Sequence, residues 1–130
     1  MKFALALFAP PHAPSSRRAL RFAEAALAGG HEIVRVFFYQ DSVQLASSLT
    51  VSAQDELDLP AAWRTFVQEH RLDGVVCIAA ALRRGVLNGE EAQRYGRAGH
   101  NLDAPWELSG LGQLHEAAQE ADRLICFGGD

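Results

Sequence analysis

Short apolar runs alternate along the chain with segments in which apolar residues recur at helical spacing. Runs rich in β-branched and aromatic residues, bounded by turn residues, are typical of buried strands. The first run ends at two prolines, and the third follows an Asp-Gly turn. We predict strands at residues 2–9, 31–39, 75–79 and 123–127.

The segments between these runs predict helices. Ser15 or Ser16 is in position to cap a first helix, which a pair of glycines at 29–30 ends. A last helix is predicted over residues 110–121, with Ser109 as its cap. Both helices lead directly into a predicted strand.

A middle helix and two less regular excursions complete the pattern. Pro60 lies near the first turn of this helix. Residues 41–52 fit either a short helix or a loop, and Asn88 is in position to cap a short helix containing Glu90 and Glu91. The apolar face of the middle helix consists of Trp63, Phe66 and Val67.

The alternation of continuous apolar strands with helices predicts one α/β domain over residues 1–130. Such strands occur in mainly parallel sheets with helices on both faces, the layering of flavodoxin-like folds. Right-handed crossovers bring the carboxyl ends of the strands to one edge of the sheet, where ligands bind in this fold class. The pattern leaves the order of the strands open.

Charge and composition exclude several classes of function. The net charge is −4, from 12 Lys and Arg against 16 Asp and Glu, so we expect no direct grip on nucleic acid. No segment reaches the ~20 apolar residues of a membrane span, and the amino terminus fits a first strand better than a signal peptide. Two cysteines without a secretory signal favour reduced thiols in the cytoplasm.

The strongest candidate for chemistry is Cys77, near the carboxyl end of the third predicted strand. A helix N-terminus or a nearby arginine favours the thiolate form of a cysteine. The segment after Cys77 offers both, because it contains Arg83 and Arg84 and can begin a helical turn. Small residues there, Ala79 and Ala80, leave room for a persulfide, and we expect the thiol to be reachable from the edge.

Other residues at the same edge are weaker candidates. His12 follows the first strand and is either a proton carrier or a turn residue. Tyr39 and Asp41 follow the second strand, where Asp41 either lines the site or caps a helix. Cys126 lies inside the last strand, and we predict that it is packed. The histidines and cysteines show no metal-ligand spacing, so we expect neither a metal ion nor an organic cofactor.

The segment CIAAALRRGV, residues 77–86, resembles the cysteine motif of the DsrE/TusD family of sulfur-relay proteins. Further similar segments are GHEIVRVFFYQDSV at 30–43 and LSGLGQLHEA at 108–117, so that the resemblance covers nearly the whole chain. It implies a DsrE-like fold and a persulfide carried on Cys77. Cys126 matches no catalytic position of the family.

The resemblance also implies partners and a pathway. Such a chain associates with TusB- and TusC-like subunits in a heterohexamer of two heterotrimers. It takes sulfur from a TusA-like donor and passes it to a TusE-like acceptor, for 2-thiolation of the tRNA wobble uridine. We therefore expect a cytoplasmic sulfurtransferase in which Arg83 and Arg84 stabilise anionic sulfur. Two alternatives stay open: a DsrE-type carrier in dissimilatory sulfur oxidation, and a scaffold with an inert cysteine.

Overall fold

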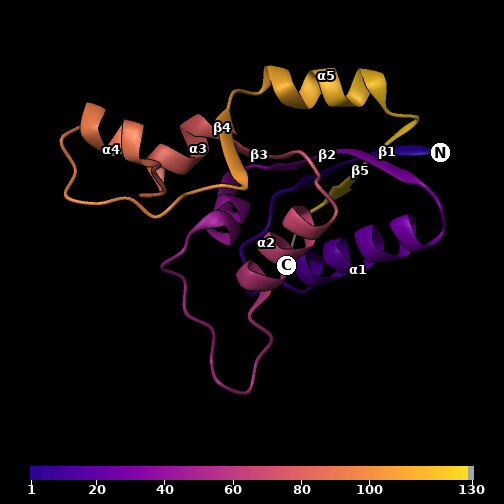
Figure 1. Ribbon diagram of the computed structural model, residues 1–130, viewed down its shortest axis with the longest axis horizontal. Helices are drawn as coiled ribbons and strands as arrows, with labels where there is room; N and C mark the ends of the chain where they lie inside the picture. Colours follow the sequence, from indigo (N-terminus) through magenta and orange to yellow (C-terminus); the bar gives the residue numbers. More distant parts are fainter. Residues whose placement is uncertain (129–130) are drawn as a thin grey trace.

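A parallel sheet forms the centre of the protein, whose computed structural model describes residues 1–128 (Figure 1). Within these residues the sheet has the order β4-β3-β2-β1-β5, and every neighbouring pair of strands is parallel. The predicted α/β fold is confirmed, and the strand order that the sequence left open is now defined. The strands are β1 (Lys2–Leu7), β2 (Glu32–Phe38), β3 (Gly74–Cys77), β4 (Trp106–Ser109) and β5 (Arg123–Phe127).

Helices cover both faces of this sheet. The helices α1 (Pro14–Ala28) and α2 (Leu59–Glu69) lie on one face, and α5 (Gly112–Glu120) lies on the other (Figure 1). The indole of Trp63 on α2 meets the ring of Phe38 on β2 edge to face, with the ring centroids 5.5 Å apart. Trp63 is fully buried, as the apolar stripe of this helix predicted.

Two predicted helix caps are wrong. Helix α1 begins at Pro14 with Ala13 as its cap, and the Ser16 hydroxyl instead donates to the carbonyl of Pro10 at 2.9 Å. Ser109 is the last residue of β4, and α5 follows Leu111 without a side-chain cap. Proline supplies the start of α1, because its missing N–H group needs no cap there.

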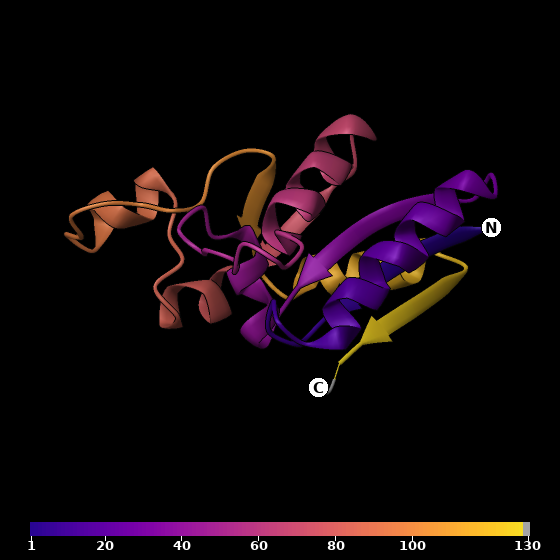
Figure 2. The ribbon, with the colours of Figure 1, turned by 90° about the horizontal axis from the view of Figure 1, so that it is seen from below.

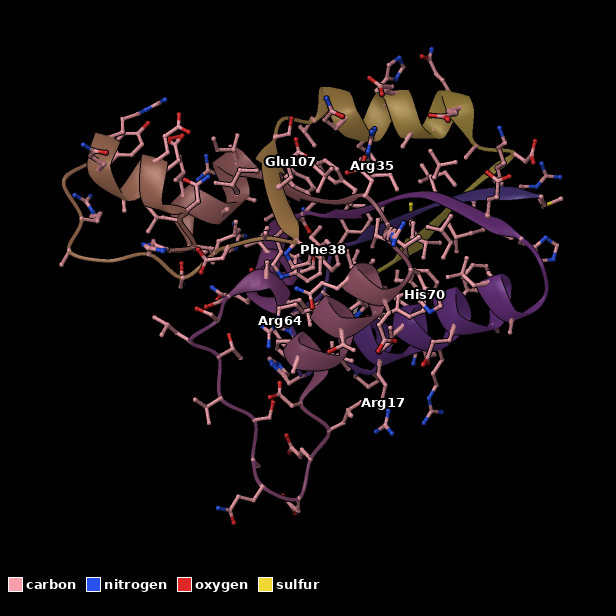
Figure 3. All side chains as sticks on the ribbon, in the orientation of Figure 1. Arg17, Arg35, Phe38, Arg64, His70 and Glu107 are labelled. Carbon is pink, nitrogen blue, oxygen red and sulfur yellow. The ribbon has the colours of Figure 1, made fainter. Side chains whose placement is uncertain are left out.

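Arg35 fastens α5 to the sheet (Figure 3). Its Nε donates to Oδ2 of Asp73 at 2.6 Å, and its Nη1 donates to the carbonyl of Gln113 at 2.9 Å. Burial disfavours the charge on Arg35, but the hydrogen bond and the negative charge of Asp73, with help from Glu116, raise the pKa of the guanidinium. Arg35 therefore stays charged and holds the start of α5 over β2.

Three short helical segments lie beyond the carboxyl ends of the strands (Figure 2). Residues 41–52 combine both predicted alternatives, because a 3-10 helix ends at Ala46 and a loop follows. The third strand is shorter than predicted, since the chain turns into a helix immediately after Cys77. The segments are η1 (Gln40–Ala46), α3 (Ile78–Arg83) and α4 (Gly89–Arg94).

The buried side chain of Asn101 holds these excursions together. Its amide nitrogen donates to the Ser47 hydroxyl at 3.0 Å and to the carbonyl of Gly85 at 3.1 Å. Its oxygen accepts from the backbone N–H of Leu87 at 2.9 Å. One amide therefore joins the segments that follow η1 and α3, which is the region around the predicted site.

Candidate functional site

Cys77 is the last residue of β3 and the residue that precedes α3. In the sheet it is aligned with Ser109, the last residue of β4. The predicted position at the carboxyl edge is confirmed. The expectation of a reachable thiol is wrong for the isolated chain, because Cys77 is 2% exposed and belongs to the main hydrophobic core.

The segment after Cys77 forms the helical turn that the sequence suggested. Helix α3 has six residues, and no side chain caps its first backbone N–H groups. Within this helix, Ala80 and Ala81 are buried, whereas Ala79 is exposed. Small side chains therefore let this turn pack closely on the edge of the sheet.

A cavity of about 290 Å³ lies between this turn and the residues that follow β2. It brings together six of the residues predicted for the site, from two separate stretches of the chain. Both stretches follow neighbouring parallel strands, which explains why they meet. The lining residues are Tyr39, Gln40, Asp41, Ala79, Ala80, Arg83 and Arg84.

The two arginines of this cavity have different environments. The Nε of Arg84 donates to Oδ1 of Asp41 at 2.8 Å, and its Nη1 donates to the carbonyl of Ala80 at 3.2 Å. Arg83 is exposed and forms no ion pair with any of residues 1–128. Arg84 is thus held in place by Asp41, whereas Arg83 is free to meet an anion.

Asp41 accordingly lines the site and is not a helix cap. The cap of η1 is Tyr39, whose backbone N–H donates to the Ser42 hydroxyl at 2.8 Å. Asp41 lies in the first turn of η1, and its carboxylate forms an ion pair with the guanidinium of Arg84 at the edge of the cavity. The ion pair therefore links η1 to the end of α3.

Gln40 is the residue of this cavity that sequence reasoning missed. Its φ of +52° lies in the left-handed region, which non-glycine residues adopt rarely and mostly at turns or functional sites. No pattern of apolar residues indicates such a conformation. The only indication in the sequence that Gln40 belongs to the site is its position between Tyr39 and Asp41, which were both candidates.

His12 lies apart from these residues. It lines a different cavity of about 390 Å³ with Pro10 and with Thr50 and Val51 of the loop after η1. Neither Arg83 nor Arg84 contributes to that cavity. The structure therefore does not bring His12 together with the group around Cys77.

The prediction that Cys126 is packed is wrong, because its side chain is exposed. Its strand β5 is at the edge of the sheet and pairs with β1 alone among the described strands. Leu124, two residues earlier and therefore on the same face of the strand, is exposed as well. Helix α5 therefore does not cover the side chains of β5 that point to its face of the sheet.

Residues 1–128 contain no group of three or more His, Cys, Asp or Glu side chains that could hold a metal ion. No helix among them is both long and apolar enough to span a bilayer. The candidate site combines the buried thiol of Cys77 with the cavity that follows β2 and β3, although Cys77 itself does not line that cavity.

The fold and site define a class, an α/β protein with a cysteine at the carboxyl edge of a parallel sheet beside a cationic cavity. Residues 1–127 match the DsrE/DsrF-like family, and the chain belongs to that family. It is 78% identical over 130 residues to the sulfurtransferase TusD homolog of Pseudomonas aeruginosa, covering 100% of this chain and 99% of the relative.

More distant relatives cover the same length. DsrE of Allochromatium vinosum is 46% identical over 129 residues, with 98% of this chain and 99% of the relative covered. Sulfurtransferase TusD of Klebsiella pneumoniae is 44% identical over 128 residues, covering 98% of this chain and 100% of the relative. The crystal structure of YchN from E. coli supports the fold alone, with a TM-score of 0.71, 19% identity and 97% of both chains covered.

Proposed function

We propose that this protein carries sulfane sulfur as a persulfide on Cys77 within a relay for 2-thiolation of the tRNA wobble uridine. The protein is a sulfurtransferase, as its full-length relatives of 78% and 44% identity are named. The observation that carries the finer proposal is the position of Cys77 at the carboxyl end of β3, directly before a turn whose residues line a cavity with two arginines.

The chemistry consists of two displacements at sulfur. The Cys77 thiolate attacks the outer sulfur of a donor persulfide, so that a new S–S bond forms while the donor S–S bond breaks and the donor cysteine leaves as a thiolate. An acceptor thiolate then attacks the outer sulfur on Cys77, and Cys77 leaves as a thiolate. Each step exchanges one S–S bond for another, so neither an oxidant nor a reductant is consumed.

Sulfur transfer requires that the buried thiol become accessible. Helix α3 is the element to move, because six residues are too few for a helix that is stable without its tertiary contacts. It ends next to Gly85, whose φ of +73° provides a pivot at which side chains other than glycine would be strained. The ion pair of Arg84 with Asp41 limits this motion, whereas Arg83 stabilises the anionic sulfur as it emerges.

We propose protein partners rather than direct contact with tRNA. The net charge of −4 opposes binding to a phosphate backbone and is compatible with protein partners. The proposed partners are TusB- and TusC-like subunits in a heterohexamer, a TusA-like donor and a TusE-like acceptor. A partner that docks at the carboxyl edge would also supply binding energy to open α3.

A sulfur carrier in dissimilatory sulfur oxidation is the second candidate. It is favoured by the 46% identity to DsrE of Allochromatium vinosum, which is close to the 44% identity to Klebsiella TusD. The 78% identity to a TusD homolog supports the thiolation pathway. A scaffold with an inert cysteine also requires a buried Cys77, but it gives no role to the cationic cavity.

Complementation of a bacterial strain that lacks its own copy of this gene tests the proposal. We expect the unchanged protein and Cys126→Ser to restore 2-thiouridine in tRNA, measured by mass spectrometry of nucleosides, and Cys77→Ser to restore none. Restoration by Cys77→Ser would refute the role of that thiol. If deletion leaves 2-thiouridine unchanged and stops sulfur oxidation, the second candidate is correct.

A further inference from the structure

Three residues on neighbouring parallel strands form a row at the carboxyl edge of the sheet. Cys77 of β3 is aligned with Ser109 of β4. On the other side of β3, Phe38 of β2 is aligned with Val76, so that Tyr39, the next residue, lies beside Cys77. Neighbouring strands lie only about 4.8 Å apart. Ser109 and Tyr39 are therefore the residues next to Cys77 on its two sides.

Cys77 and Ser109 point to the face of the sheet that α5 covers. A Cβ atom added to Gly74 would meet the ring of Trp106 and the side chain of Val67 on α2. Gly74 and Trp106 therefore face α2. Successive residues of a strand point to opposite faces. Cys77 and Ser109, each three residues further along its strand, accordingly point away from α2.

Tyr39 points to the same face as Cys77. The guanidinium of Arg35 donates to the carbonyl of Gln113 on α5, and Tyr39 lies four residues further along the same extended chain. Phe38, which precedes Tyr39, points the other way, toward Trp63 of α2 (Figure 3). Tyr39 also lines the cavity of about 290 Å³ at this edge. It therefore connects the buried thiol with that cavity.

The hydroxyl groups of Ser109 and Tyr39 are available as donors to a ligand. Neither hydroxyl donates a hydrogen bond to any group among residues 1–128. Ser109 does not cap α5, which follows Leu111 without a side-chain cap. Both residues are half-buried, whereas Cys77 is buried. The two donors thus lie between the thiol and the solvent.

We propose that the hydroxyl groups of Ser109 and Tyr39 bind the outer sulfur atom of a persulfide on Cys77. This binding rests on the proposed function, because it concerns the sulfur that the protein would carry. An S–S bond places the outer sulfur about 2 Å beyond the sulfur atom of Cys77, within reach of donors on both flanking strands. A deprotonated persulfide carries negative charge on this outer atom, and hydrogen bonds to a charged group are the stronger ones.

The two hydroxyl groups keep their positions when the turn after Cys77 opens. Ser109 is the last residue of β4, and Tyr39 directly follows β2. Arg83, in contrast, belongs to α3, which is the element that moves. Donors fixed to the sheet hold the outer sulfur in place while α3 opens, and an acceptor thiolate can then attack it.

An exchange equilibrium measures this binding without depending on the rate at which α3 opens. Every chain in the experiment carries Cys126→Ser, so that Cys77 is its only thiol. The thiolate of Cys77 attacks the outer sulfur of glutathione persulfide, a new S–S bond forms, and glutathione leaves as a thiolate. Intact-mass measurement after equilibration with glutathione and its persulfide gives the ratio of loaded to unloaded chain. This ratio yields the exchange constant.

Removal of either hydroxyl group should weaken the loaded state. Ser109→Ala and Tyr39→Phe should each lower the exchange constant about tenfold, because each removes one hydrogen bond to an anionic sulfur. Ser109→Thr keeps the hydroxyl group and should stay within about threefold of the parent chain. The matched controls are Ser48→Ala and Tyr95→Phe, which remove exposed hydroxyl groups elsewhere. Alkylation of unloaded Cys77, which reports the opening of the turn, should change by less than about twofold in every variant.

The possible outcomes separate this binding from the proposed function. A parent chain that gains no sulfur would mean that Cys77 is not a carrier, and both would fail. A parent chain that loads, with equal exchange constants for Ser109→Ala and Tyr39→Phe, would overturn the binding alone. A loss in Ser109→Thr as large as that in Ser109→Ala would assign the effect to packing and would overturn the binding as well.

Discussion

The two cysteines occupy regions that differ in burial and in surroundings. Cys77 is buried at the end of β3, a strand with neighbours on both sides, and a turn with two arginines follows it. Cys126 is exposed on the edge strand β5. Exposure alone would select Cys126 as the reactive thiol, whereas the proposed function assigns that role to Cys77 at the carboxyl edge of the sheet.

If Cys77 is the reactive thiol, as proposed, its position at the carboxyl edge of the sheet matters more for reactivity than its accessibility in the resting chain. A group at this edge gains backbone N–H groups and side chains from several loops, as the cavity around Arg83 shows. A side chain exposed on an edge strand, such as Cys126, is surrounded mainly by solvent. The contrast can be tested by perturbing each region in turn.

The largest expected effect concerns the rates of alkylation of the two thiols. A buried group reacts only when the chain opens locally, and an opening that costs about 3 kcal/mol slows the reaction by roughly 100-fold. We expect iodoacetamide to modify Cys126 at least about 100-fold faster than Cys77 in the isolated chain. Peptide mass spectrometry measures both rates, and the urea-unfolded chain, where they should be equal, is the control. Equal rates in the folded chain would contradict the burial of Cys77.

A smaller effect is expected from Asn101→Ala. This change leaves the partly buried carbonyl of Gly85 and N–H group of Leu87 without their partner, which costs about 2–3 kcal/mol in the free energy of unfolding. Urea denaturation measures that loss, and alkylation of Cys77 should become faster while that of Cys126 stays the same. Asn88→Ala, which removes the cap of α4, is the matched control, and it should cost only about 1 kcal/mol.

Removal of the link between η1 and α3 should have a modest effect. Asp41→Asn weakens a partly exposed ion pair worth about 0.5–1 kcal/mol, so alkylation of Cys77 should become roughly two- to fivefold faster. Glu90→Gln weakens the ion pair with Arg94 on α4 and should leave the rate unchanged. A slower reaction in Asp41→Asn would show that the ion pair does not restrain the turn.

The smallest effect is expected from Cys126→Ser. An exposed thiol on an edge strand makes few packing contacts, so its replacement should change the free energy of unfolding by no more than about 0.5 kcal/mol. Thermal or urea denaturation measures this difference. A loss of several kcal/mol would mean that β5 is covered by contacts that the single chain does not show.

The sequence predicted four strands, the parallel sheet and the edge that carries the candidate site, because apolar runs and helical stripes are local patterns. It missed β4, whose four residues include the exposed Glu107 and form no apolar run. It extended the third strand to Ala79, because Ile78 and Ala79 fit a strand and a helix equally well by polarity.

Features that depend on the order of the strands could not be predicted from local patterns of apolar residues in the sequence. The exposure of Cys126 follows from the edge position of β5, which the apolar composition of residues 123–127 does not indicate. The pairing of Arg84 with Asp41 joins residues 43 positions apart and depends on β2 and β3 being neighbours. The burial of Cys77 likewise depends on how α3 packs after the strand ends.

Transfer of sulfur from a persulfidated TusA-like protein, followed by intact-mass measurement, tests the central claim most directly. A protein donor is needed because a small persulfide can also modify the exposed thiol of Cys126. The account predicts that Cys126→Ser gains one sulfur atom and passes it to an acceptor thiol, whereas Cys77→Ser gains none. Loading of Cys77→Ser equal to that of the unchanged chain would contradict it.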